Sequence, residues 1–235
     1  MSNFNLELFN GHPIINDGEN TILIDTGAPA TIHAAGIINF CSTAYICSKN
    51  YMGLTIAQVS EMLGKNISAL LGTDILSNYK ILFDYNNKVV TFREQEVRLE
   101  GEDTPISNFM GIPVIALSID GQELKFFLDT GAKLSYLPAS ITSKYSSIGT
   151  EGDFYPGVGK FDTECFEIPT SLGNKHFMVK YGNLPALLQM SLMLGGTDGI
   201  IGFDFFNHFK VLLDLKNKIL KYSQTTLKTG NTKVY

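Results

Sequence analysis

The stretch that decides the fold is ILIDTGAPATI, residues 22–32, in which Asp25 ends an apolar run and is followed at once by Thr and Gly. Carboxylates are rarely buried in proteins unless they are paired or hydrogen-bonded. A second copy of the pattern, FFLDTGAKLSYL at residues 126–137, contains Asp129, which follows Asp25 by 104 residues. If Asp25 is buried, we therefore expect Asp129 to lie opposite it.

A longer internal match indicates that the chain consists of two related halves. Residues 62–92 parallel residues 193–222, and both segments end with an apolar strand, a turn containing Asn and Lys, and another strand, which is typical of a hairpin. The matched pairs are Gly72 with Gly202, Asp74 with Asp204, Lys80 with Lys210 and Asp84 with Asp214. We expect Asp74 and Asp204 to be the N-cap residues of the short helices that follow them.

The repeat predicts an all-β fold of two lobes related by a pseudo-twofold axis, with a few short helices. Residues 54–63, LTIAQVSEML, form the clearest amphipathic helix pattern. Residues 93–108 are polar and charged, as a boundary between domains usually is. We therefore expect an N-terminal lobe at 1–98, a linker at 99–108 and a C-terminal lobe at 109–235.

Composition excludes several classes of function. The 235 residues carry a net charge of −5 and no basic stripe, so nucleic acid is not an expected partner. No apolar run approaches the roughly 18 residues of a membrane helix, and the N-terminus does not have the pattern of a signal peptide. A cytoplasmic location is therefore the default expectation. The three cysteines, at 41, 47 and 165, lack zinc-site spacing and are expected to be ordinary thiols.

The pseudo-twofold axis gives the two aspartates a chemical role. Equivalent residues meet near such an axis, so Asp25 and Asp129 become neighbours that share one proton. The ionised carboxylate can take a proton from water while the protonated one donates to a carbonyl oxygen, which is acid–base catalysis of amide hydrolysis. Gly27 and Gly131 allow close approach of the backbone, and the hydroxyls of Thr26 and Thr130 can hydrogen-bond the opposite half.

These residues resemble the retropepsin-like aspartic proteases. The signature is Asp-Thr-Gly after an apolar strand, with a later apolar pair before Gly, here ALLG at 69–72 and GIIG at 199–202. Retroviral members assemble the site from two identical chains, whereas pepsin-like members carry both halves in one chain, as here. The resemblance implies a monomeric endopeptidase that acts on extended peptide or protein substrates, with Asp25 and Asp129 as the catalytic pair and with no metal or organic cofactor.

The residue after each Asp-Thr-Gly departs from the pattern of the pepsin-like members. Pepsin-like enzymes usually place Ser or Thr after Asp-Thr-Gly, whereas Ala28 and Ala132 stand there in this chain, as in retroviral members. Without a neighbouring hydroxyl donor, we expect higher pKa values for the aspartates and activity at weakly acidic pH. The alternative interpretation is a retropepsin-like module that binds peptides or directs assembly without significant turnover.

The second half contains an expected flap. Between the Asp-Thr-Gly and Met-Leu-Gly motifs it is 27 residues longer than the first half, and the surplus includes DFYPGVGKFDTECFEI at 153–168. This reads as strand, Gly-rich turn and strand, with Gly157, Val158 and Gly159 at the tip and with Tyr155 able to contact substrate. The first half is too short for a matching hairpin. We therefore expect one flap over an asymmetric cleft; the alternative is an ordinary surface hairpin.

Overall fold

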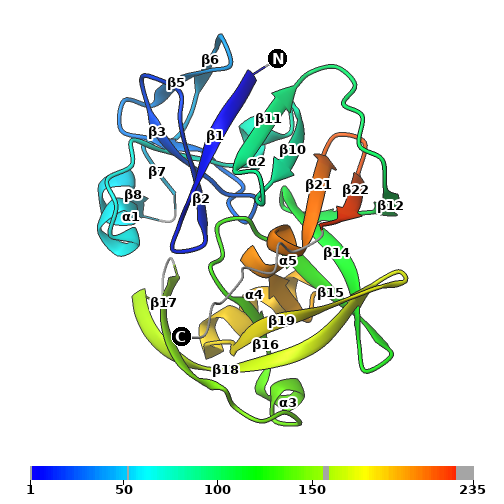
Figure 1. Cartoon of the computed structure of the whole chain (residues 1–235). Helices are drawn as coiled ribbons and strands as arrows, with labels where there is room; N and C mark the ends of the chain where they lie inside the picture. Colours follow the sequence, from blue (N-terminus) through cyan, green and yellow to red (C-terminus); the bar gives the residue numbers. More distant parts are fainter. Residues whose placement is uncertain (1, 52, 156–158, 226–235) are drawn as a thin grey trace, which may run out of the picture.

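The computed structural model describes residues 2–51, 53–155 and 159–225, which form two lobes stacked on one another (Figure 1). The elements of the first half are β1 (Ser2–Phe9), β2 (His12–Asn16), β3 (Thr21–Ile24), β4 (Ile32–His33), β5 (Ile37–Phe40), β6 (Thr43–Ile46), β7 (Asn50–Tyr51), β8 (Leu54–Thr55), α1 (Ile56–Leu63), β9 (Ala69–Leu71), α2 (Thr73–Leu76), β10 (Lys80–Asp84) and β11 (Val89–Arg93).

The second half has a similar order, with an additional helix, α3, and with long strands β17, β18 and β19 before α4. Its elements are β12 (Glu102–Pro105), β13 (Ser107–Phe109), β14 (Ile112–Ile119), β15 (Gln122–Leu128), β16 (Ser135–Leu137), α3 (Ala139–Thr142), β17 (Gly149–Tyr155), β18 (Gly159–Leu172), β19 (Lys175–Asn183), α4 (Ala186–Gly195), β20 (Gly199–Ile201), α5 (Phe203–His208), β21 (Phe209–Asp214) and β22 (Ile219–Gln224). The expected all-β architecture with short helices is confirmed.

Each half places its Asp-Thr-Gly segment by the same pairing of strands. β3 runs parallel to β9, and β15 runs parallel to β20. The parallel pairing continues one residue beyond each strand, because the Asp25 N–H donates to the Leu71 carbonyl and the Asp129 N–H donates to the Ile201 carbonyl, both at 3.0 Å. The apolar pair before Gly in each half thus holds the backbone of its own aspartate.

The two lobes share a sheet. The order of its ten strands is β12-β22-β21-β10-β11-β1-β2-β3-β9-β4, and β10 of the first half pairs antiparallel with β21 of the second. Two reciprocal ion pairs cross this junction: Lys80 Nζ lies 3.3 Å from Asp214 Oδ2, and Lys210 Nζ lies 2.8 Å from Asp84 Oδ2. Each lysine matched in the sequence repeat therefore pairs with the matched aspartate of the opposite half, across the pseudo-twofold axis. The shared sheet fixes how the lobes face each other.

The segment 99–108, expected to be a linker, contains two short strands. β12 pairs with β22 at the edge of the shared sheet, and β13 begins the eight-stranded sheet of the second lobe. That sheet has the order β13-β14-β15-β20-β16-β19-β18-β17. The polar composition of the segment fits an edge position, because an edge strand keeps one side exposed to solvent.

The N-cap expectation for Asp74 and Asp204 is wrong. The N-cap residues of α2 and α5 are Gly72 and Gly202, where a Cβ would meet the backbone of Ala30 at 2.7 Å and of Ala132 at 2.4 Å. The helices begin at these glycines because the loop after each Asp-Thr-Gly passes directly against them. The Asp74 carboxylate instead accepts hydrogen bonds from the N–H and hydroxyl of Thr31, and the Asp204 carboxylate accepts one from the Lys180 N–H.

The amphipathic helix forms as α1, with Thr55 as its N-cap and with Ile56, Val59 and Leu63 buried. Thr55 and Gln58 form a capping box, which stabilises the first turn. Within the described residues, none of the helices has both the length and the apolar character needed to span a membrane.

Candidate active site

The two Asp-Thr-Gly loops meet at the interface between the lobes. A Cβ added to Gly27 would lie 2.3 Å from Cγ of Asp129, and a Cβ added to Gly131 would lie 2.6 Å from Cγ of Asp25. Each carboxyl group therefore rests against the glycine of the opposite lobe, where a side chain larger than hydrogen does not fit. The structure thus brings together the two aspartates that the sequence repeat singles out.

Each carboxyl group is also held by its own loop. The Gly27 N–H donates to Asp25 Oδ1 at 2.9 Å, and the Gly131 N–H donates to Asp129 Oδ1 at 2.8 Å. A backbone donor of this kind fixes the carboxyl plane and stabilises the ionised form. The two arrangements are alike, as the pseudo-twofold relation requires.

Thr26 and Thr130 join the lobes directly beneath the carboxyl groups. The Thr26 N–H donates to the Thr130 hydroxyl at 3.0 Å, and the Thr130 N–H donates to the Thr26 hydroxyl at 2.9 Å. The two hydroxyls donate onward to the carbonyls of Leu128 and Ile24, at 2.7 and 2.8 Å. Both threonine side chains are fully buried, so this network of four hydrogen bonds holds the aspartates at a fixed separation.

Burial and mutual proximity perturb the ionisation of the pair. Burial raises the pKa of Asp25 to about 6, although hydrogen bonds from Asp129 and from the Gly27 N–H oppose the rise. Burial and the neighbouring charge of Asp25 raise the pKa of Asp129 well above its ordinary value. The two carboxyl groups are close enough for their titrations to be coupled, so these shifts belong to the pair, which binds protons more tightly than two isolated aspartates would.

The β17–β18 hairpin extends from the second lobe toward the first. The Phe154 ring packs against the apolar cluster of the first lobe, and its centroid lies 5.6 Å from that of the His12 ring. The Tyr155 ring packs against the apolar cluster of the second lobe, and burial, followed by the charges of Asp129 and Asp25, raises the pKa of its hydroxyl. Gly159 opens β18 with φ of 84°, while Gly157 and Val158 lie outside the described residues.

His12 lies beside the loop of Asp129 and was not singled out by the sequence analysis. The His12 Nδ1–H donates to the Gly131 carbonyl at 2.8 Å, and the side chain is only 4% exposed. Burial lowers the pKa of His12, so it is neutral at neutral pH. The signal was present in the repeat: GHPII at 11–15 corresponds to GIPVI at 111–115, and the imidazole replaces an isoleucine.

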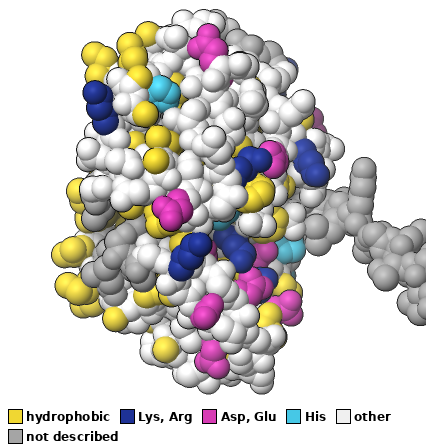
Figure 2. Space-filling model, turned by 90° about the vertical axis from the view of Figure 1, so that its left-hand side faces the viewer, with side chains coloured by type: hydrophobic (Ala, Val, Ile, Leu, Met, Phe, Trp, Pro, Cys, Tyr) yellow, Lys and Arg dark blue, Asp and Glu magenta, His cyan; other side chains and the backbone are white. Residues whose placement is uncertain are grey.

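A groove of about 350 Å³ opens between the lobes beside these residues. It is lined by Asn10 and His12 of the first hairpin, by Met62 and Leu63 of α1, and by Lys133, Gly152, Asp153, Phe154, Lys160, Phe161 and Asp162. Figure 2 shows the side of the molecule that carries α1 and β17, where basic and acidic side chains are interspersed. Lys133 and Lys160, together with Asp153 and Asp162, give this groove charges of both signs.

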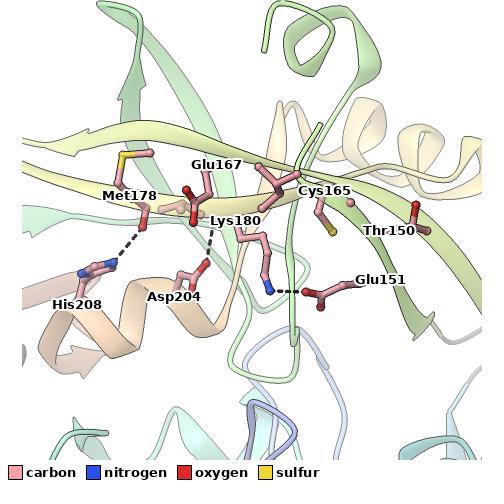
Figure 3. Close-up of a pocket in the computed structure, with 11 residues that line it drawn as sticks. Thr150, Glu151, Cys165, Glu167, Met178, Lys180, Asp204 and His208 are labelled. Carbon is pink, nitrogen blue, oxygen red and sulfur yellow. Dashed lines mark hydrogen bonds and ion pairs between the residues drawn. The ribbon is translucent and has the colours of Figure 1, made fainter. Parts of the chain in front are cut away.

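A second cavity, of about 420 Å³, lies away from the carboxyl pair between the β17–β19 strands and α5 (Figure 3). Glu151, Lys180, Asp204 and His208 point into it. The His208 Nε2–H donates to the Met178 carbonyl at 2.9 Å, and the Asp204 carboxylate accepts from the Lys180 N–H at 2.8 Å. In the part of the chain that the structure describes, no three His, Cys, Asp or Glu side chains are grouped so that they could hold a metal ion.

The fold is similar to that of the two-lobed pepsin-like aspartic proteinases. The aspartic proteinase from Irpex lacteus matches with a TM-score of 0.53 and 12% identity, over 97% of this chain and 98% of that protein. A retropepsin-like aspartic protease from Rickettsia conorii matches 55% of this chain and 100% of its own length, with a TM-score of 0.37 and 17% identity. The simian foamy virus protease matches 38% of this chain and 86% of its own length, with a TM-score of 0.29 and 13% identity. No protein-family model and no curated protein sequence matches the chain.

Proposed function

We propose that this protein is an aspartic endopeptidase whose catalytic pair is Asp25 and Asp129. The observation that carries the proposal is that two buried carboxyl groups face each other. Each contacts the glycine of the opposite lobe and accepts a hydrogen bond from the glycine N–H of its own loop. Such a pair holds one proton between two groups, which is the state that acid–base hydrolysis of an amide requires.

The proposed reaction needs one ionised and one protonated carboxyl group, and we assign the ionised role to Asp25 and the protonated role to Asp129. Asp25, as the ionised member, takes a proton from a water molecule whose oxygen attacks the peptide carbonyl carbon, while protonated Asp129 donates to the carbonyl oxygen. The tetrahedral intermediate then collapses: a hydroxyl proton of the intermediate returns to Asp129, the C–N bond breaks, and Asp25 delivers its proton to the leaving nitrogen. Both carboxyl groups end as they began.

The β17–β18 hairpin is proposed as the single flap, with Tyr155 facing the substrate. The packing of Phe154 of this hairpin against the apolar cluster of the first lobe and against His12 supports this. In the first lobe, the described β5–β6 hairpin packs on the core of its own lobe, where the Tyr45 and Tyr79 hydroxyls lie 2.8 Å apart. The described residues of β7 and β8 form a much shorter hairpin than β17 and β18 do. Replacing residues 156–160 by a short turn should strongly reduce the rate of cleavage without unfolding the protein. Cleavage at the wild-type rate by that variant would contradict the flap assignment.

A peptide-library digest tests the proposed activity. We expect cleavage at discrete positions within extended peptides. The double variant Asp25→Asn, Asp129→Asn is the control for contaminating proteases. Binding of library peptides by both proteins with no cleavage by either would instead favour a peptide-binding module.

A further inference from the structure

The β1–β2 hairpin of the first lobe and the β13–β14 hairpin of the second lobe turn in the same way. The two residues of each turn have positive φ, 50° and 87° at 10–11 and 51° and 93° at 110–111. Two successive residues with positive φ between antiparallel strands are typical of a type I′ turn. The residues that follow the two turns, His12 and Ile112, therefore stand at the same position of their hairpins.

Each of these turns lies against the segment that follows Asp-Thr-Gly in the opposite lobe. Figure 1 shows the turn between β1 and β2 at the boundary between the lobes. A Cβ added to Gly11 would lie 3.5 Å from Cγ of Lys133. A Cβ added to Gly111 would lie 3.6 Å from Cβ of Pro29. Lys133 and Pro29 each follow their own aspartate by four residues, so the two turns are also equivalent in what they contact.

His12 hydrogen-bonds the Asp-Thr-Gly loop of the opposite lobe, whereas the matched Ile112 cannot. The distance from His12 Nδ1 to the Gly131 carbonyl oxygen is 2.8 Å, and the side chain is only 4% exposed. A carbonyl oxygen can only accept, so Nδ1 carries the proton. An isoleucine side chain has no donor. Of the two matched positions, only the one in the first lobe therefore supplies a side-chain hydrogen bond to the opposite loop.

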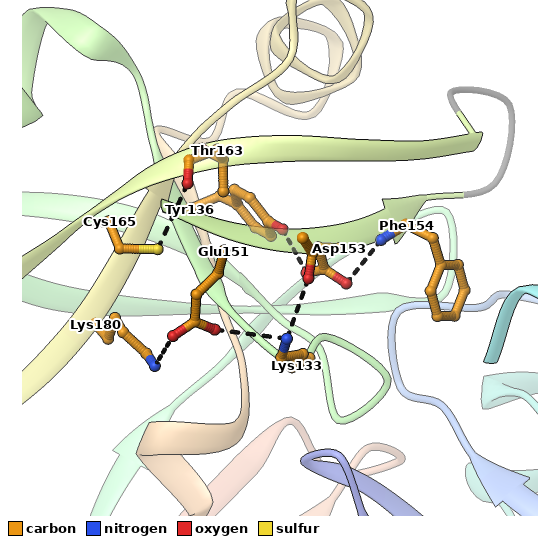
Figure 4. Close-up of polar contacts among 9 residues, drawn as sticks. Lys133, Tyr136, Glu151, Asp153, Phe154, Thr163, Cys165 and Lys180 are labelled. Atoms are coloured by element: carbon orange, nitrogen blue, oxygen red, sulfur yellow. Dashed lines mark hydrogen bonds and ion pairs between the residues drawn. The ribbon is translucent and has the colours of Figure 1, made fainter. Parts of the chain in front are cut away.

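The surroundings of the His12 ring hold it in this orientation. Its centroid lies 5.6 Å from that of the Phe154 ring. The charged groups that act on His12 are Asp153, which precedes Phe154 in β17, and Lys133, which donates to the same strand (Figure 4). Burial lowers the pKa of His12 and outweighs the rise due to its hydrogen bond and to Asp153, while Lys133 lowers the pKa further. The ring is therefore a neutral donor at neutral pH.

The hydrogen bond from His12 acts on Asp129 through one peptide unit. The Gly131 carbonyl and the Ala132 N–H belong to the same planar unit, so a donor that fixes the carbonyl also fixes the direction of the N–H. Burial and the charge of Asp25 raise the pKa of Asp129, and the N–H groups of Gly131 and Ala132 oppose this rise. The peptide unit that His12 holds is thus one of the groups that stabilise the ionised form of Asp129.

We propose that His12 is a positioning residue that holds Asp129 in its working orientation by fixing the peptide unit after Gly131. The inference rests on the proposed endopeptidase function. A buried and packed donor of this kind keeps a reacting group within the small deviations in geometry that catalysis tolerates. Because Ile112 has no donor, the two carboxyl groups of an otherwise symmetric pair have different surroundings.

The test compares His12→Ile, which introduces the residue of the matched position, with His12→Asn, whose side-chain amide can place a donor where Nδ1 lies. His12→Ile should lower kcat for a cleaved peptide about tenfold or more, with little change in KM. It should also raise the midpoint of kcat/KM against pH by about half a unit, because N–H donation to Asp129 weakens. His12→Asn should retain most of kcat and the wild-type midpoint.

Ile112→Val is the matched control, because it changes packing at the equivalent position of the other hairpin without removing a donor. It should leave kcat and the pH midpoint unchanged. Wild-type kcat and midpoint in a folded His12→Ile variant would overturn the proposal. Equal losses in His12→Ile and His12→Asn would also overturn it, since the ring rather than the donor would then be responsible.

Titration of the aspartate carboxyl carbons by NMR separates failure of this inference from failure of the proposed function, because it requires no turnover. His12→Ile should raise the titration midpoint of the pair by about the same half unit. If the wild-type protein cleaves no peptide and the shift is present, the proposed function is refuted and the link from His12 to Asp129 stands. If the wild-type protein cleaves peptides and the shift is absent, the link is refuted and the function stands.

Discussion

Replacing both aspartates by asparagine should stabilise the folded protein at neutral pH while it removes activity. A carboxyl group whose pKa is raised on folding contributes stability that is fully present below its unfolded pKa and is lost as pH rises through its folded pKa. The pKa of Asp25 rises from 3.8 to about 6. At about 1.4 kcal/mol per pKa unit, the wild-type protein should lose about 3 kcal/mol through Asp25 between about pH 4 and pH 7.

The assay is urea unfolding of the wild-type protein and of the Asp25→Asn, Asp129→Asn variant across this pH range. Asparagine does not titrate, so the variant should not lose stability through these two positions as the pH rises. Its side-chain oxygen can still accept a hydrogen bond from the Gly27 or Gly131 N–H. Carboxylates elsewhere, such as Asp84 and Asp214, are present in both proteins and cancel in the difference. The difference in free energy of unfolding, variant minus wild type, should therefore increase by about 3 kcal/mol or more between about pH 4 and about pH 7. A difference that does not change with pH would refute the buried, proton-sharing pair.

Three further predictions concern the geometry, ionisation and assembly of the site. Gly27→Ala should lower kcat at least about a hundredfold, because its Cβ would lie 2.3 Å from Cγ of Asp129; near-normal turnover would show that the carboxyl groups do not face each other as described. The profile of kcat/KM against pH should rise with a midpoint near the pKa of Asp25, about 6, and a maximum at strongly acidic pH would contradict that ionisation. Specific activity should stay constant on dilution to nanomolar protein, since one chain carries both aspartates; a second-order loss would indicate a site shared between chains.

The architecture could be predicted because the chain repeats itself. Two Asp-Thr-Gly segments, each with a later apolar pair before Gly, dictate two parallel strand pairs whose ends carry the aspartates. Once the halves are equivalent, a pseudo-twofold axis between them follows. The matched lysines, Lys80 and Lys210, then pair with the matched aspartates of the opposite halves, Asp214 and Asp84.

Features that depend on contacts between segments distant in the sequence could not be predicted in the same way. Asp74 was assigned to a helix cap because local pattern favours that role, whereas its carboxylate binds Thr31, which lies 43 residues away in the chain. His12 looked isolated until β2 placed it against the Gly131 carbonyl. The Lys133 Nζ donates to the Gly152 carbonyl of β17, 19 residues further along the chain, and no local motif in the sequence predicts that contact.

Cleavage of a single library-derived peptide by the wild-type protein and by Asp25→Asn and Asp129→Asn tests the central claim most directly. Each single variant should lose about a thousandfold or more in kcat, because neither carboxyl group alone can serve as both acid and base. Each should keep the wild-type circular dichroism spectrum and the slow amide exchange of the shared sheet. A folded single variant that cleaves the peptide within about tenfold of the wild-type rate would contradict the assignment of Asp25 and Asp129 as the catalytic pair.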